Sequence, residues 1–171
     1  SVLSDQPNEN ISSYQKILLE MRLYLCPNLD IAKYSLAELY NLEKTNKLAL
    51  KKLNSISSDS FFFLPSNLKK ISIIESLKKQ NDYLNLLLKS IKKWPKNKLL
   101  LYRLAAYYKS KKQFLESIEI YQKIIDIYGE NDRDIFLYAS NLDKIGKWKE
   151  AKTLFLKLLK KDSNSKHTLN Y

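Results

Sequence analysis

The chain contains very little glycine, proline, cysteine and histidine. Among 171 residues there are two glycines, four prolines, one cysteine and one histidine. So few glycines and prolines leave little material for the turns of a sheet protein. Long stretches rich in Leu, Lys, Ile, Glu and Ala favour helix instead. We therefore expect an all-α fold.

The same scarcities exclude several kinds of functional site. His167 is the only histidine, which excludes His-based catalytic triads and metal sites with two imidazoles. Two glycines provide no Gly-rich phosphate loop. Acidic pairs such as Glu116/Glu119 and Asp132/Asp134 are expected on solvated helix faces or at helix starts rather than around a metal. We expect neither an enzyme nor a bound cofactor.

A lone cysteine and the absence of long apolar runs set further limits. Cys26 excludes an intrachain disulfide and is interpreted as a small packing residue rather than a reactive thiol. No apolar run approaches the roughly 18 residues of a transmembrane helix, so membrane insertion is not expected. The chain opens with Ser1 instead of an initiator methionine. We therefore expect a piece of a longer protein. Its compartment is left open between the cytoplasm and the periplasm or cell envelope.

Positive charge is abundant, with 30 basic against 18 acidic residues and a formal net charge of +12. Basic surfaces attract phosphate, but only Arg22, Arg103 and Arg133 are arginines, the residues that read phosphates and bases in a bidentate manner. Lysine pairs such as Lys78-Lys79 fall where helices are expected to end, and there they favour the helix dipole. We interpret the charge as solvated helix faces, with nucleic acid as the less favoured partner.

The most informative feature is a repeat with a fixed 34-residue period. Four bulky residues follow it, namely Tyr34, Leu68, Tyr102 and Phe136. The pairs Leu36-Ala37, Leu104-Ala105 and Tyr138-Ala139 recur at the same interval. A fixed period of this length indicates stacked helix pairs that bury their apolar faces on one another. We therefore predict an α-solenoid of antiparallel helix pairs.

The period divides the chain into a leading segment, four units and the start of a further unit. Residues 1–29 are predicted as a polar leading segment with a degenerate helix, which starts at Ser12 or Ser13 and runs to about Cys26. The four units span 30–63, 64–97, 98–131 and 132–165, and 166–171 begin a truncated one.

Within the last two units the helix boundaries are sharper. In unit 98–131 helices are expected from Lys98 to Ser110 and from Phe114 to Ile127, followed by a turn at Gly129. In unit 132–165 the first helix starts at Asp132 or Asp134. The interhelix turn lies at Gly146, and Trp148 to Lys161 form the second helix.

The units resemble tetratricopeptide repeats. That family has small residues at positions eight and twenty of each unit and bulky or aromatic residues at positions four, eleven and twenty-four. Unit 98–131 shows this pattern in Leu101, Leu104-Ala105, Tyr108, Ser117, Tyr121 and Ile124, and unit 132–165 shows it in Ile135, Tyr138-Ala139, Leu142, Ala151, Phe155 and Leu158. Small residues let two helices cross closely. Unit 64–97 departs, with Ile71 and Tyr83 at those two positions, so we expect it to be the loosest. The resemblance covers about residues 12–171, looks most like bacterial, alphaproteobacterial proteins, and implies a right-handed superhelix.

The resemblance also implies a concave groove, lined by the first helix of each unit, that binds a peptide or a partner subunit. Carried over position by position, its partner-binding residues are Tyr34, Glu38, Leu68, Tyr102, Arg103, Lys109, Phe136, Ser140 and Lys144. The ladder formed by Tyr34, Leu68, Tyr102 and Phe136 has a second interpretation, as core between units. The sequence therefore predicts a protein-interaction scaffold. The alternatives are non-specific RNA binding by the helical repeat and a purely structural spacer.

Overall fold

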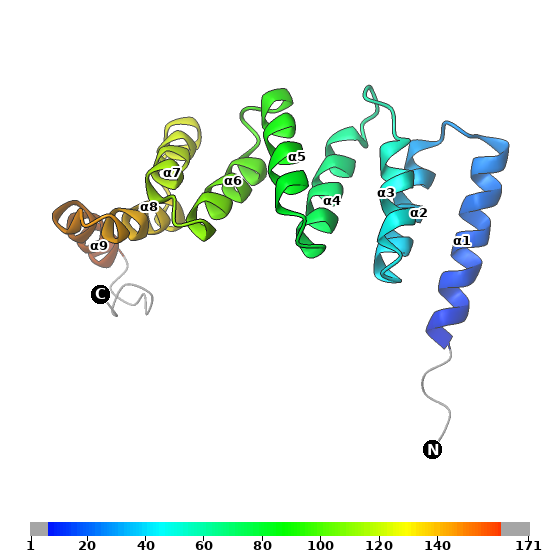
Figure 1. Cartoon of the computed structure of the whole chain (residues 1–171), viewed down its shortest axis with the longest axis horizontal. Coiled ribbons are helices and arrows are strands. Elements are labelled where there is room, and N and C mark those ends of the chain that lie inside the picture. Colours follow the sequence, from blue (N-terminus) through cyan, green and yellow to red (C-terminus); the bar gives the residue numbers. More distant parts are fainter. Residues whose placement is uncertain (1–6, 162–171) are drawn as a thin grey trace, which may run out of the picture. The chain divides into compact units, whose positions relative to one another are not determined.

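The computed structural model describes residues 7–161, with side chains from Ser12 onward. Over this range the chain forms helices and no strands (Figure 1). The helices are α1 (Pro7–Leu25), α2 (Asp30–Leu42), α3 (Asn46–Asn54), α4 (Phe63–Ser76), α5 (Gln80–Lys93), α6 (Lys98–Ser110), α7 (Phe114–Tyr128), α8 (Asp132–Lys144) and α9 (Trp148–Lys161). The all-α prediction is confirmed. His167 and the truncated unit 166–171 lie outside the described residues.

Helix boundaries in the second half of the chain agree with the sequence, whereas those of α1 do not. Helices α6 and α9 have the predicted bounds, and α7 ends slightly later than predicted, at Tyr128. Helix α1 begins at Pro7, so the predicted start at Ser12 or Ser13 is wrong. Proline suits the first turn of a helix because its fixed φ is helical and the missing N–H would be unpaired there. Cys26 follows the end of α1 and is exposed, so its interpretation as a packing residue is also wrong.

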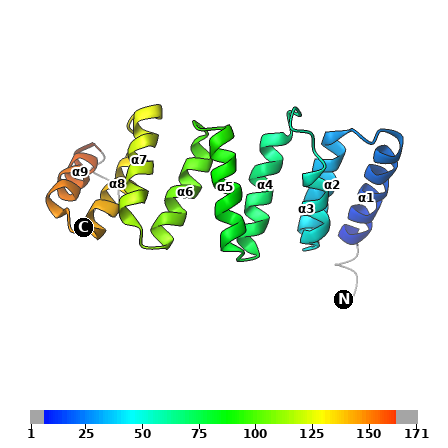
Figure 2. The same cartoon turned by 45° about the horizontal axis from the view of Figure 1, so that its top comes forward.

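The chain folds as two compact units, residues 1–86 and residues 87–171, which divide within α5. In the N-terminal unit α1 packs on α2, α2 on α3 and α3 on α4. In the C-terminal unit α6 packs on α7, α7 on α8 and α8 on α9 (Figure 2). Turns and short loops join these neighbours, so each helix runs antiparallel to the next. Each unit is therefore a piece of α-solenoid.

Each unit has its own buried core, built from the residues that recur at the 34-residue period. In the N-terminal unit Ala37, Ala49 and Leu53 are fully buried and form one cluster with Ile56 and Ile73. In the C-terminal unit one cluster is formed by Leu101, Ala105, Tyr121 and Ile124, and another by Ile135, Ala139, Leu142, Ala151, Phe155 and Leu158. The small residues lie where two helices of a pair cross. The Ser117 hydroxyl, for example, donates to the Ala105 carbonyl oxygen on the facing helix at 3.1 Å.

The turn inside each helix pair has the same backbone conformation in every repeat. Lys44, Lys78, Lys112 and Gly146 follow the ends of α2, α4, α6 and α8, and their φ angles are 59°, 56°, 59° and 80°. The next residue donates its N–H back to the helix, as from Gln113 to the Tyr108 carbonyl at 2.9 Å. This is a Schellman-type helix end, which normally has glycine at the left-handed position because a Cβ costs energy there. Three of the four turns have lysine instead.

Replacing Lys44, Lys78 or Lys112 by glycine should therefore stabilise the protein. We expect each change to raise the free energy of unfolding by about 0.5 kcal/mol, because relief at the positive φ outweighs the extra freedom of glycine in the unfolded chain. Urea unfolding followed by circular dichroism measures this difference. The reverse substitution, Gly146→Lys, should lower stability by a similar amount, since no atom lies within 4 Å of a Cβ built there and only the backbone is strained. A stabilising Gly146→Lys would contradict the argument.

Candidate functional site

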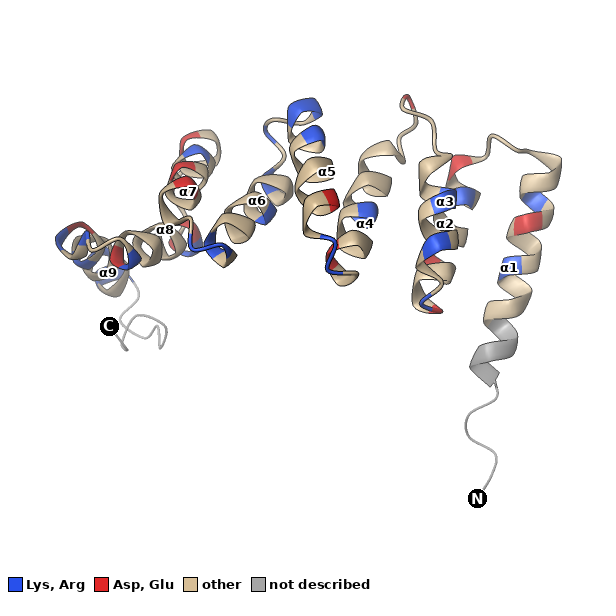
Figure 3. Cartoon of the chain, viewed as in Figure 1, with Lys and Arg blue, Asp and Glu red and all other residues tan. Residues whose placement is uncertain are grey.

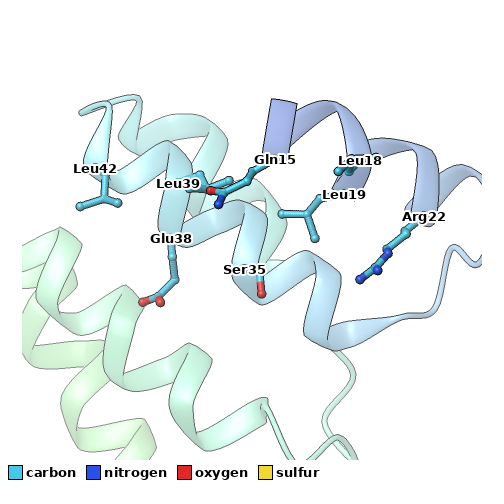
Figure 4. Close-up of a pocket in the computed structure, with 8 residues that line it drawn as sticks. All are labelled: Gln15, Leu18, Leu19, Arg22, Ser35, Glu38, Leu39 and Leu42. Carbon is cyan, nitrogen blue, oxygen red and sulfur yellow. The ribbon is translucent and has the colours of Figure 1, made fainter. Parts of the chain in front are cut away.

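A groove of about 430 Å³ lies between α1 and α2 in the N-terminal unit (Figure 4). Helix α1 contributes Gln15, Leu18, Leu19 and Arg22, and helix α2 contributes Ser35, Glu38, Leu39 and Leu42. Each set follows the i, i+3, i+4, i+7 spacing that places side chains on one face of a helix. Two helix faces thus form the two walls of one groove.

Four leucines and four polar or charged side chains line the groove. Leu18 and Leu42 are 59% and 75% exposed, well beyond what is usual for side chains of an intramolecular core. Arg22 and Ser35 lie toward one end of the groove, and Gln15 and Leu42 lie toward the other (Figure 4). An apolar channel with a cation at one end suits an amphipathic ligand.

Glu38 supplies the negative charge of this groove and belongs to a small polar cluster. Its carboxylate forms an ion pair with Lys69 Nζ at 2.6 Å. The pKa of the Tyr34 hydroxyl is raised, first by burial and then by the nearby Glu38 carboxylate. Since the hydroxyl stays protonated at neutral pH, it remains a hydrogen-bond donor beside Glu38.

The structure brings together some of the residues predicted to bind a partner in the N-terminal unit. Glu38 lines the groove, whereas Tyr34 is half-buried with its ring against Phe62, at 5.6 Å between centroids. Leu68 is half-buried on α4. Part of the Tyr34 side chain therefore packs in the core, and part stays accessible to solvent.

In the C-terminal unit the predicted residues are divided between the core and the surface. Tyr102 and Phe136 are half-buried, and the Phe136 ring packs on Phe155 at 5.7 Å. Ser140 is buried and its hydroxyl donates to the Phe136 carbonyl oxygen at 2.8 Å. Arg103 is half-buried, and Lys109 and Lys144 are exposed. Whether these side chains contact a partner stays a prediction.

Asp134 is fully buried and organises a polar network that the sequence did not reveal. Tyr102 Oη donates to Asp134 Oδ1, Asn131 Nδ2 donates to Asp134 Oδ2, and Lys98 Nζ lies 3.0 Å from Asp134 Oδ2. The Asp134 N–H donates to Asn131 Oδ1 at 3.0 Å, which makes Asn131 the N-cap of α8. The prediction that Asp134 lies at a helix start or on a solvated helix face is confirmed in its first alternative, and the burial of the side chain is a finding of the structure.

Two tyrosines in or beside this network have raised pKa values. The pKa of Tyr102 is raised by burial and by its hydrogen bond to Asp134. Burial raises the pKa of Tyr121, whose ring lies 6.4 Å from that of Tyr102, to about 12. The pKa of Lys98 is also raised, chiefly by its hydrogen bond to Asp134. The Tyr102 hydroxyl is therefore engaged in a hydrogen bond within the protein, and only the ring is available to a ligand.

Sequence reasoning misses the α1 wall of the groove because α1 lies within residues 1–29, outside the four repeat units. Leu18 also belongs to an apolar stripe with Tyr14, Ile17, Met21 and Leu25, which lies on a neighbouring face of α1. All five are exposed in the structure. The sequence shows this apolar stripe but not that it remains uncovered.

Two further features are absent from the described part of the chain. No group of three or more His, Cys, Asp or Glu side chains there is arranged to hold a metal ion. Nor does any described helix have the length and apolar character needed to cross a bilayer.

Known structures share the architecture described above. The chain superposes on MamA with a TM-score of 0.66 at 18% identity, over 91% of this chain and 85% of that one. It superposes on YrrB, described as a TPR protein with an unusual peptide-binding site, with a TM-score of 0.67 at 9% identity, over 95% and 84% of the two chains. A tetratricopeptide repeat protein from Parabacteroides merdae gives 0.73 at 14% identity, over 92% of this chain and 63% of that one.

These similarities show that the chain has the tetratricopeptide-repeat fold, an all-α solenoid. No protein-family model and no curated protein sequence matches the chain. At such low identity the likeness is one of fold.

Proposed function

We propose that this protein is an interaction scaffold that binds a helical segment of a partner protein in the groove between α1 and α2. The observation that carries the proposal is the exposed apolar lining of the groove, in which Leu18 and Leu42 on its two helices remain uncovered. A groove between two helices presents parallel ridges, and a third amphipathic helix fills such a groove by inserting its own apolar side chains.

The charged side chains that line the groove define which ligand helix binds best. Arg22 favours an acidic side chain on the ligand, and Glu38, shared with Lys69, favours a donor such as lysine or a backbone N–H. Apolar residues at i, i+3 and i+4 would face Leu18, Leu19 and Leu39. The proposed ligand is thus an amphipathic segment with charges of both signs beside its apolar stripe. YrrB is described as having a peptide-binding site, and this supports a peptide-binding role for the present chain only by analogy of fold.

The remaining predicted residues extend this proposal along the first helices of the pairs. Tyr34 and Leu68 lie on α2 and α4 of the N-terminal unit, and Tyr102 and Phe136 lie on α6 and α8 of the C-terminal unit. Their half-buried rings and side chains offer rigid apolar surface, which binds a ligand with little loss of side-chain freedom. In the N-terminal unit a longer peptide would continue over Tyr34 and Leu68.

A photo-crosslinking residue at Leu18 identifies the segment that occupies the groove, because it reacts only with what lies against it. The captured segment is then synthesised and titrated against the protein by calorimetry and circular dichroism. We expect it to gain helix on binding. Leu18→Ser/Arg22→Ser should weaken it at least tenfold, since burying one leucine contributes about 1.5–3 kcal/mol.

The matched control is Lys152→Ser/Leu156→Ser on α9, which removes one leucine and one basic residue at the same i, i+4 spacing in the other unit. All four positions are exposed, so neither variant should unfold the protein. Equal affinity of both variants for the segment would exclude the α1–α2 groove, and a ligand that stays unfolded when bound would exclude a helical occupant.

A further inference from the structure

The turns inside the helix pairs form a distinct edge in each unit. In the N-terminal unit the turns α2–α3 and α4–α5 lie along one edge, and the loops α1–α2 and α3–α4 lie along the other (Figures 1 and 2). In the C-terminal unit the antiparallel packing of α6 through α9 likewise places the turns α6–α7 and α8–α9 on one edge. We call these edges the turn edges, one in each unit.

Lysines lie on the turn edges, as the blue segments at the α2–α3 and α4–α5 turns show for the N-terminal unit, and further lysines lie along the helices (Figure 3). The exposed lysines are Lys44, Lys47, Lys78 and Lys79 in the N-terminal unit, and Lys109, Lys111, Lys112, Lys144, Lys147 and Lys149 in the C-terminal unit. Nearby carboxylates are Glu43, Glu75 and Asp82 in the first, and Glu116, Asp143 and Glu150 in the second. Lysines outnumber them on both edges.

Some of this charge is neutralised within the protein. Glu43 pairs with Lys16 on α1 at 2.6 Å, and Glu150 pairs with Lys147 at 3.3 Å. The loops at the opposite edge themselves carry less charge, although Lys92, Lys93 and Lys98 flank the α5–α6 loop on the adjoining helices. Those at 26–29 and 55–62 contain Asp59 as their one charged residue, and those at 94–97 and 129–131 contain Lys96 and Glu130. The excess of lysine in the connecting segments is therefore confined to the turn edges.

Every turn also exposes a large apolar side chain beside its lysines. Leu48 does so at α2–α3, Leu77 at α4–α5, Leu115 at α6–α7 and Trp148 at α8–α9. Leu115 and Trp148 are 62% and 69% exposed. Lysines that surround exposed leucine and tryptophan are the composition of a surface that lies on an anionic bilayer. The lysines attract the headgroups and the apolar tips enter the interface.

We infer that the turn edges dock this protein peripherally on anionic lipid membranes. Nucleic acid fits less well, because leucine contributes nothing to phosphate contacts and single strands are held by stacked aromatic rings. Of the apolar side chains that the turns expose, only Trp148 is aromatic. The inference does not depend on the α1–α2 groove.

The strained lysines allow a test that cannot be confused with misfolding. Lys44→Gly/Lys78→Gly/Lys112→Gly removes three positive charges from the turn edges while stabilising the fold. The control Lys51→Gln/Lys89→Gln/Lys123→Gln removes three exposed lysines from the second helices of the pairs. Both are sedimented with vesicles of phosphatidylserine and phosphatidylcholine. One lysine near an anionic surface contributes roughly fivefold to binding, so the glycine variant should bind at least about 25-fold more weakly and the control much less so.

Trp148 reports the apolar part of the contact. Its fluorescence should shift to the blue with anionic vesicles, and the shift should be lost in Trp148→Ser, which retains Trp94. Equal binding to pure phosphatidylcholine, or equal loss in the glycine and glutamine variants, would overturn the inference. Binding of single-stranded RNA but not of vesicles, with the loss confined to the glycine variant, would also overturn it and make the edges a nucleic-acid surface.

Discussion

Replacing Asp134 by alanine is expected to lower the free energy of unfolding by about 3 kcal/mol. The carboxylate is fully buried and accepts hydrogen bonds from Tyr102 and Asn131 while it pairs with Lys98. Alanine leaves the Tyr102 hydroxyl without its acceptor and removes a negative charge from the first turn of α8. The hydrogen bond from Tyr102 and the ion pair with Lys98, which join α6 to α8, are thereby lost.

Urea unfolding of the variant measures the loss, and Asp132→Ala is the matched control. Asp132 lies in the same helical turn, but its ion pair with Lys161 at 2.7 Å is exposed. Such a pair contributes at most about 1 kcal/mol. A double-mutant cycle between Tyr102→Phe and Asp134→Asn isolates the hydrogen bond. Equal losses for Asp134→Ala and Asp132→Ala would show that burial of the network contributes nothing.

The second large effect is expected from Ala105→Leu, which should destabilise the protein by about 3 kcal/mol. Ala105 is fully buried where α6 crosses α7, and its carbonyl oxygen accepts the Ser117 hydroxyl at 3.1 Å. The added carbon atoms of leucine have no space between two backbones this close. The helices must separate, and the hydrogen bond is lost with their packing.

Ala106→Leu provides a neighbouring control in the same helix. Ala106 is exposed, and alanine and leucine have similar helix propensities, so the expected change is within about 0.5 kcal/mol. Thermal and urea unfolding of both variants test the prediction. If Ala105→Leu were as stable as Ala106→Leu, the small residue at this position of the repeat would not set the distance between the helices.

Much of the fold could be predicted because it rests on local interactions that repeat. The spacing of Leu101, Ala105 and Tyr108 defines one helix face, and the same spacing recurs in the next unit. Gly129 and Gly146 marked helix ends because both have a positive φ, which glycine adopts without strain. Helix α1 was predicted less well, since its pattern has no second copy in the chain with which to compare it.

The candidate site was predicted less completely because burial depends on what covers a side chain. The sequence assigned Asp134 to the start of a helix, but only the packing of α6 against the same unit's helices places Tyr102 and Lys98 around it. The ladder residues Tyr34 and Phe136 are half-buried against Phe62 and Phe155, partners that lie beyond the next turn or loop of the chain.

By itself, the sequence determined the helical class, the period and the identity of the close-packed alanines, because these follow from spacing along one chain. Only the tertiary structure decided which apolar faces stay uncovered. Leu18 on α1 and Leu101 on α6 are equally apolar, yet the first is 59% exposed and the second fully buried. The difference arises because helices pack on both sides of Leu101, whereas the wall of the α1–α2 groove faces open space.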